Sequence, residues 1–273
     1  MNIPAKKPVS YAHAVVALLD IVGFGDLVKK SRAAARPLKV LDALRSQFHI
    51  PDNHATHGLR LILMSDTVVY LVLTEPDWQR QPGTAVMSAL SRVASAQMKL
   101  LEHGILLRGG LTRGHVHFDD STNTVVGPAL CVAHEIESRA AVFPRVAVDP
   151  ALIDGAASMC RNGSVIRFSD GIWFVNYLRL VDPMVIAPCY ENASRDAEML
   201  EAHKKAVLGY MTKACSAETH AKCAWLVMYH NVFAEHLHDR IRRLGAPKSD
   251  ALLKRAEEAR IRGGELAQRL AYR

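Results

Sequence analysis

The chain has 273 residues, 49% of them hydrophobic, which is enough for a sizeable core and argues against a disordered chain. No apolar run approaches the ~20 residues that a membrane span needs, and the first residues contain no secretory apolar region. The five cysteines form no C-x-x-C pair, which argues against a disulfide framework and fits a reducing compartment. We therefore expect a cytoplasmic protein that does not act at a membrane.

The net charge of +7 is concentrated near the C-terminus. The stretch Arg240–Arg273 contains ten Lys or Arg and four Asp or Glu, a net charge of +6. A basic helical tail of this kind is more typical of a solvated face or an assembly element than of a nucleic-acid reader. We expect no nucleic-acid partner, and a nucleic-acid-binding regulator that uses this tail stays a lesser hypothesis.

The predicted elements begin with the stretch around which the chain is organised, Val15–Gly25. It is a run of strand-forming apolar residues with one carboxylate, Asp20, set into it. Gly23–Gly25 predicts a tight turn, and a helical pattern begins at Asp26. Burying an unpaired carboxylate costs several kcal/mol, so Asp20 needs a cation, hydrogen-bond donors or a route to water.

The remaining elements follow in chain order from hydrophobic periodicity and turn residues. Strands are predicted at His13–Val22, Leu59–Met64, Thr67–Leu73, Ile105–Val116, Arg145–Val148, Val165–Phe168 and Ile172–Tyr177. Helices are predicted at Leu38–Phe48, Thr84–His103 and Gly127–Ala141, and from Ala197 onward, after an irregular Pro183–Arg195. This order favours an α+β sandwich with helices on one face of a mostly antiparallel sheet, followed by a helical appendage.

The helical appendage carries an apolar stripe and two histidines. Trp225, Tyr229 and Phe233 recur every four residues, a spacing typical of core or dimer packing rather than of base stacking. His230 and His238 lie on the same predicted helix, and we expect them at the surface.

Two carboxylates are predicted to converge in this topology. Only Ser65-Asp66 separates two strands, so Asp66 lies at the tip of a hairpin that can sit beside the end of the first strand. A divalent cation would resolve the repulsion between Asp20 and Asp66, and the helix that follows Gly23–Gly25 presents free N–H groups to an anion. The alternatives are a helix N-cap for Asp20 and an ordinary turn residue for Asp66.

At these residues the sequence resembles the class III nucleotide cyclases. The D-I-V-G-F of Asp20–Phe24 and the S-D-T-V-V of Ser65–Val69 are similar to the two metal-aspartate motifs of that family. The strand motif R-x-G-[IL]-x-x-G matches Arg108–Gly114, and the helix that follows it matches Gly127–Glu137. The resemblance covers roughly residues 15–148 and implies a ferredoxin-like class III cyclase sandwich over residues 1–196, with a C-terminal helical extension over residues 197–273.

Two positions depart from the family pattern. Where the family helix carries an asparagine that orients ribose and an arginine that stabilises the transition state, this sequence has Cys131 and Glu135. The departures favour a catalytically inactive, cyclase-like sensor of a nucleotide or protein partner, whereas the retained aspartate pair favours an enzyme.

One branch of the family resembles the sequence more closely. The R-G-G-L-T-R-G strand, the G-P-A-L-x-x-A-x-x-I-E helix, the P-R-V-A-V strand and the stretch Lys222–Asn231 are similar to the bacterial Pycsar pyrimidine cyclases of anti-phage defence. This resemblance implies a uridylate cyclase that converts UTP to cyclic UMP, a second messenger for a downstream cyclic-nucleotide effector. A cytidylate cyclase that makes cyclic CMP is the alternative.

The resemblance also implies roles for particular residues. Asp20 and Asp66, helped by the Ile21 carbonyl, would hold two divalent ions, Mn²⁺ or Mg²⁺. Backbone N–H groups of Phe24 and Gly25 would hold the phosphates of the substrate. Class III cyclases share their sites between two subunits, so a two-fold homodimer with two composite sites is implied.

The remaining assignments concern the missing cation and the base. Arg113 is the candidate replacement cation, with a solvated strand residue as its alternative, and Arg108 is either a site residue or a structural salt-bridge partner. Thr112 and Cys131 are candidates for lining the substrate pocket, although Cys131 also fits a small buried hydrophobic position. Core packing is the favoured role of Tyr70.

Overall fold

The structure, a computed structural model, describes residues 10–48, 58–74, 82–154, 163–180, 190–212, 216–244 and 249–263. The strands are β1 (Ala12–Ile21), β2 (Leu59–Met64), β3 (Thr67–Leu73), β4 (Leu107–Asp119), β5 (Thr124–Val126), β6 (Val146–Val148), β7 (Val165–Arg167) and β8 (Trp173–Val175). The helices are α1 (Phe24–Lys30), α2 (Ala35–Phe48), α3 (Pro82–Glu102), α4 (Pro128–Ala140), α5 (Pro150–Asp154), α7 (Tyr177–Leu180), α8 (Tyr190–Met211), α9 (Ala217–Leu244) and α10 (Ser249–Ala259).

The strands form one mixed sheet in the order β2-β3-β1-β4-β6-β8-β7, with β5 paired to the far end of β4. The neighbours pair antiparallel except for β4 and β6, which are parallel. β1 is flanked by β3 and β4, and this register sets Asp20 opposite Thr67 on one side and Arg108 on the other. The α+β class predicted from the sequence is confirmed.

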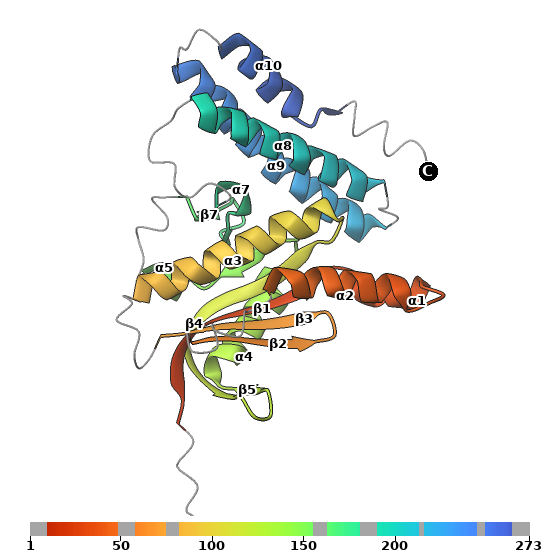
Figure 1. The fold of residues 1–273 in the computed structure, drawn as a ribbon. Helices are drawn as coiled ribbons and strands as arrows, with labels where there is room; N and C mark the ends of the chain where they lie inside the picture. The colour runs from red at the N-terminus through yellow and green to blue at the C-terminus, as the bar shows by residue number, and fades with distance from the viewer. Residues whose placement is uncertain are drawn as a thin grey trace, which may run out of the picture.

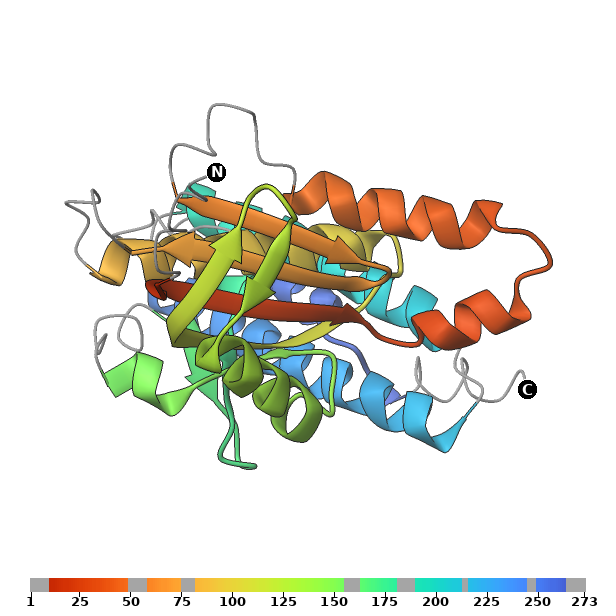
Figure 2. The same cartoon turned by 90° about the horizontal axis from the view of Figure 1, so that it is seen from below.

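Helices cover both faces of the sheet, which differs from the single covered face that the sequence pattern predicted. Val15, Ala17 and Leu19 of β1 belong to the core beneath α3, whereas Val16 and Leu18 pack with residues of α4. Figures 1 and 2 show α3 and α2 on one side of the sheet and α4 on the other. A strand that is apolar at both odd and even positions needs cover on both faces.

α4 lies unusually close to β4 because the strand carries glycines where the helix crosses it. A Cβ built on Gly110 would lie 2.1 Å from the Ala133 carbonyl oxygen and 3.0 Å from the Glu137 nitrogen. A Cβ on Gly114 would lie 3.3 Å from the Cβ of Ala129. The glycines of the R-G-G-L-T-R-G stretch therefore set the depth at which α4 docks.

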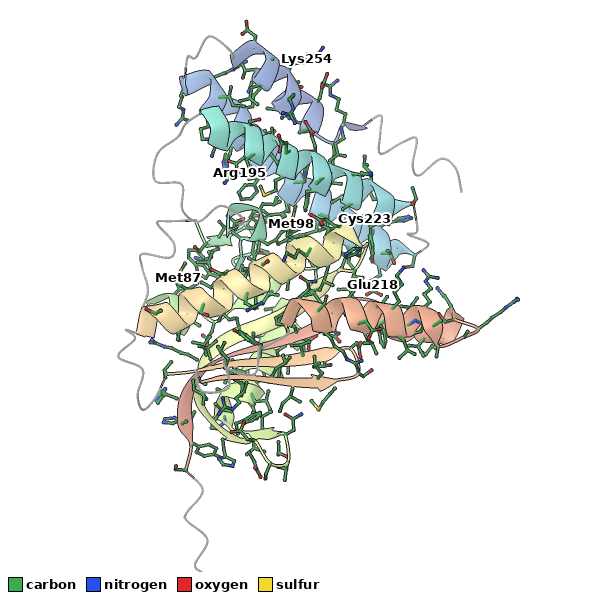
Figure 3. All side chains as sticks on the ribbon, viewed as in Figure 1. Met87, Met98, Arg195, Glu218, Cys223 and Lys254 are labelled. Carbon is green, nitrogen blue, oxygen red and sulfur yellow. The ribbon has the colours of Figure 1, made fainter. Side chains whose placement is uncertain are left out.

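The helical region after the sheet packs onto the α3 side of the molecule. α8, α9 and α10 stack on one another above α3 (Figure 1). Met98 of α3 and Cys223 of α9 are both buried in the main core, and Figure 3 labels them where α3 meets these helices. α8 begins at Tyr190, earlier than the sequence pattern predicted, and residues 183–189 of the predicted irregular segment lie outside the described residues. The division at residue 197 stays a prediction.

A buried chain of hydrogen bonds joins three of the late helices to α7. The Nε2 of His230 lies 2.8 Å from the Ala259 carbonyl oxygen, the Nδ1 atoms of His230 and His203 lie 2.9 Å apart, and the His203 Nε2 lies 2.9 Å from the Tyr177 hydroxyl. Because a carbonyl only accepts, His230 donates from Nε2. Burial lowers the pKa of His203, and a neutral His203 donates from one ring nitrogen and accepts at the other, so it can bond to both His230 and Tyr177.

The expectation of a surface His230 is therefore wrong, since its side chain is fully buried. His238 is partly buried. Trp225 and Tyr229 are buried in the core with their rings stacked on each other, as the apolar stripe predicted. The Tyr229 hydroxyl donates to Asn176 at 2.7 Å, which adds a second polar link to the end of β8. Within the described ranges, no helix is long and apolar enough to cross a membrane.

We predict that Gly110→Ala lowers the free energy of unfolding by about 3 kcal/mol, because the new methyl group must displace the backbone of α4. Gly209→Ala is the matched control: this glycine lies inside α8 with nothing within 4 Å of an added Cβ, so the exchange should stabilise by up to about 1 kcal/mol. Chemical denaturation of the purified proteins measures both. Equal stability of Gly110→Ala and the wild type would contradict the close docking of α4.

We predict that the histidine pair makes the fold sensitive to acid. Burial and the neighbouring His230 hold the pKa of His203 well below its usual 6.5, so the stability contributed by neutral His203 is present above pH 6.5 and is lost as the pH falls. Between pH 7.5 and pH 5 the loss is about 2 kcal/mol for a group that stays neutral when folded.

The variant His203→Gln, which does not titrate, should lose less stability over this range than the wild type. His220→Gln, at an exposed position of α9, should lose as much as the wild type does. Denaturation curves at the two pH values measure this, and an identical loss in all three proteins would refute the assignment.

Candidate functional site

The two predicted carboxylates lie side by side. Asp20 is the penultimate residue of β1 and pairs with Thr67, the first residue of β3, so the β2–β3 turn brings Asp66 next to it. Ser65 in this turn has a positive φ of 56°, which closes the two-residue connection. The carboxylate of Asp66 is near enough to raise the pKa of Asp20 by charge repulsion and by hydrogen bonding.

The surroundings of Asp20 make its ionised form costly. Burial is the largest cause, followed by the Asp66 charge, and together they raise the pKa of Asp20 to about 6 against the opposing effect of Arg108. The Asp20 side chain is 22% exposed. A carboxylate in this position gains from an additional cation, because the charge of Arg108 does not fully offset the burial and the repulsion.

Arg108 links Asp20 to a residue that the sequence analysis did not select. Its Nη2 lies 3.2 Å from the Asp20 carboxylate and 2.8 Å from the Glu137 carboxylate on α4. The side chain of Glu137 is only 8% exposed. The salt-bridge role considered for Arg108 is thus what the structure shows, and it takes place at the carboxylate pair itself.

A sequence signal for Glu137 was present. Ala129, Ala133 and Glu137 recur every four residues and are the buried residues of α4. A glutamate on the buried stripe of a helix needs a cationic partner, and Arg108 sits two positions before Gly110, the glycine against which that stripe packs. That this partner is Arg108 follows only from the register of the sheet, which places Arg108 on the face that α4 covers.

The donor set fits a divalent cation of the Mg²⁺ or Mn²⁺ class. Two adjacent carboxylates, with the main-chain carbonyl of Ile21 at the end of β1, provide the hard oxygen ligands that such ions take, and substrate phosphates usually complete the coordination. Among the described residues there is no group of three or more His, Cys, Asp or Glu side chains arranged to hold a metal. A metal here would therefore depend on its substrate for several of its ligands.

The β1–α1 turn lies directly beyond the carboxylates. Gly23 has a positive φ of 78° and precedes the first residue of α1, a conformation that favours glycine. The Phe24 side chain is buried in the core, whereas Gly25 is exposed. The first N–H groups of a helix have no partner within it, and the use of those of Phe24 and Gly25 for phosphate stays a prediction.

Arg113 is not brought to the carboxylates within one chain. It is exposed on β4, pairs with Val15, and is separated from Arg108 by an odd number of positions. Since successive side chains of a strand alternate between faces, Arg113 belongs to the α3 face and Arg108 to the α4 face. A catalytic role for Arg113 would require a second copy of the chain.

Thr112 and Cys131 differ in their exposure. Thr112 is buried, and its hydroxyl donates to Asp149 at 2.5 Å. Cys131 is exposed on α4, so the expectation of a small buried position for it is wrong, and Glu135 is exposed on the same helix. Tyr70 is buried with its ring 5.8 Å from that of Phe48, in agreement with the core role predicted for it.

Comparisons with known proteins give similarity in structure only. No protein-family model and no curated protein matches the chain. The fold is similar to that of the adenylyl cyclase CyaB from P. aeruginosa, with 19% identity and a TM-score of 0.46 over 60% of this chain and 94% of that one.

Two further solved structures are similar. A guanylyl cyclase domain of the RhoGC fusion protein from Blastocladiella emersonii has 15% identity and a TM-score of 0.43 over 61% of this chain and 96% of that one. A class III adenylyl cyclase-like ATP-binding protein from Pseudomonas aeruginosa has 13% identity and a TM-score of 0.48 over 68% and 43%. At TM-scores below 0.5 these likenesses assign no activity.

We predict that metal-free protein is destabilised by ionised Asp20 at neutral pH. Because the folded-state pKa of Asp20 is raised from 3.8 to about 6, the stability associated with its protonated form is present below pH 3.8 and is lost as the pH rises through 6. In EDTA, Asp20→Asn should therefore melt above the wild type at pH 8, and the difference should shrink at pH 5.

Melting curves by scanning fluorimetry from pH 5 to pH 8 measure this effect. Asp42→Asn, at an exposed position of α2, controls for the loss of one negative charge. Adding Mn²⁺ at pH 8 should raise the melting temperature of the wild type and of Asp42→Asn but not that of Asp20→Asn. An equal rise in the melting temperature of Asp20→Asn on addition of Mn²⁺ would contradict the assignment of Asp20 as a metal ligand.

Proposed function

We propose that the protein is a metal-dependent uridylate cyclase, which converts UTP to 3′,5′-cyclic UMP and pyrophosphate. The observation that carries this proposal is the pairing of Asp20 with Asp66 at the end of β1, where the pKa of Asp20 is raised. Such a pair suits divalent ions that accompany a triphosphate. The choice of uracil rests on the sequence resemblance to the Pycsar pyrimidine cyclases.

Asp20, Asp66 and the Ile21 carbonyl hold the two ions in this proposal, and Arg108 keeps the Asp20 carboxylate in place. When bound, Mn²⁺ or Mg²⁺ neutralises phosphate charge and lowers the pKa of a coordinated hydroxyl. Glu137 balances the charge of Arg108 from the α4 side.

The reaction forms one bond and breaks another at the α-phosphorus. The 3′-oxygen of ribose attacks this atom, the bond to the β-phosphate bridging oxygen breaks, pyrophosphate leaves, and the 3′-hydroxyl proton passes to solvent. Backbone N–H groups of Phe24 and Gly25 orient the triphosphate. Thr112 and Cys131 line the substrate pocket in this proposal, as the resemblance implies.

A two-fold homodimer completes the site in this proposal. Arg113 lies on the opposite face from Asp20, so it supplies the missing positive charge only to a site shared with a second copy. The product is a second messenger for anti-phage defence, recognised by a separate cyclic-nucleotide effector.

A catalytically inactive nucleotide sensor is the second candidate function. Its supporting observation is the exposed face of α4, which presents Cys131 and the negatively charged Glu135 at the positions of the asparagine and arginine that active class III cyclases use. A glutamate there opposes rather than stabilises negative charge on a transferring phosphate.

We predict that purified protein incubated with Mn²⁺ and UTP forms cyclic UMP, detected by chromatography and mass spectrometry, with less or no product from CTP, ATP and GTP. Asp20→Ala and Asp66→Ala should each lower the rate by at least 10³-fold, because each removes a ligand of the ions. Their melting curves should show folded protein.

Cyclic CMP as the main product would replace the uridylate assignment with the cytidylate one. No cyclised product from any of the four triphosphates, together with saturable binding of one of them, would establish the sensor instead.

A further inference from the structure

A cavity of about 730 Å³ lies where the β1–α1 turn, α2 and the C-terminal helices meet. Its wall includes Gly23 from the turn, Val40 from α2 and Thr219 from α9. Figure 3 labels Glu218 on the first turn of α9, at the end of that helix which lies near α2. This volume is within the range of about 300–1,000 Å³ typical of sites for small molecules of nucleotide or drug size.

The cavity lies on the opposite side of β1 from the carboxylate pair. Ile21 lines it and belongs to the core beneath α3. Asp20, one residue earlier, points to the α4 face, where Arg108 and Glu137 hold it. The cavity shares the β1–α1 turn with the proposed phosphate site but not the carboxylates, and a ligand in it is detected by binding alone, without turnover.

The cavity lining combines buried or partly buried apolar side chains with exposed, positively charged ones at its opening. Ile21, Leu27, Val40 and Ile105 contribute apolar side chains. Surfaces of this kind favour a ligand that brings an apolar, ring-sized body out of water.

Three exposed cations, Lys30, Arg36 and Lys39, lie on the α1–α2 side of the cavity. None of the three forms an ion pair with another described residue, and Asp26 is the one carboxylate among the described lining residues. Three cations against one carboxylate leave the lining with an excess of positive charge, which raises the local concentration of anions.

The third wall comes from the C-terminal helices. Tyr210 of α8, with Ser216 and Thr219 at the start of α9, lines the cavity. A molecule bound there touches both α1–α2 and the extension, so its binding stabilises the docked arrangement of the two.

We propose that this cavity is a binding site for an organic anion, with an apolar ring system on the floor and a sulfonate, phosphate or carboxylate against Lys30, Arg36 and Lys39. The ligand bridges the β1–α1 turn and the extension. Its occupancy is thereby linked to the turn that carries Phe24.

The probe for this site is 8-anilino-1-naphthalenesulfonate, which joins an apolar ring body to one anionic group. Fluorescence titration of the full-length native protein should give a saturable site. The double variant Arg36→Ala/Lys39→Ala should weaken binding of the probe at least tenfold. Lys29→Ala, an exposed cation of α1 outside the cavity lining, is the matched control and should bind as the wild type does.

The uncharged analogue N-phenyl-1-naphthylamine separates a lost charge from a damaged fold. Its dissociation constants for the double variant and the wild type should agree within twofold. Ala43→Met, which puts a larger side chain into the cavity, should weaken the binding of both probes. Unchanged sulfonate binding in the double variant would overturn the proposal. So would an equal loss of both probes in the double variant, because the cations would then not act on the anionic group.

Discussion

The partly buried carboxylate of Asp20 is the constraint on which the rest of the site depends. It sits at the end of the central strand, beside a second carboxylate and in surroundings that raise its pKa to about 6. Arg108 provides a positive charge from the neighbouring strand, and Glu137 on α4 balances that cation in turn. Arg108 thus offsets only part of the negative charge at Asp20 and Asp66, which leaves this pair suited to an additional cation.

The close docking of α4 makes that arrangement possible. Gly110 lets the helix backbone approach β4 to a distance that any side chain would prevent, and the same approach places Glu137 within 2.8 Å of Arg108. Gly110 of the strand motif and Glu137 of the helix motif are thus structurally dependent on each other: the glycine permits the close approach that brings the glutamate to Arg108. The sequence patterns at Arg108–Gly114 and Gly127–Glu137 are thus explained by packing and charge balance.

The C-terminal helices are integrated with the sheet domain by two different means. The buried pair His203 and His230 links α10, α9, α8 and α7 through a chain of hydrogen bonds. Near the start of α9, a cavity with a cationic mouth separates these helices from α1 and α2. The C-terminal helices are therefore held by buried hydrogen bonds at one contact and border a cavity at another.

The sequence by itself determined most of the longer elements and the convergence of Asp20 with Asp66. Periodicity and turn residues are local properties, and the bounds predicted for β2 and β3 are those observed. Because side chains alternate along a strand, the five-residue spacing of Arg108 and Arg113 also places them on opposite faces of the sheet. Only the tertiary structure decided that Arg108 joins Asp20 to Glu137, that α4 covers a second face, and that His230 is buried. A buried histidine and a surface histidine have the same local pattern, because what distinguishes them is a partner far away in the sequence.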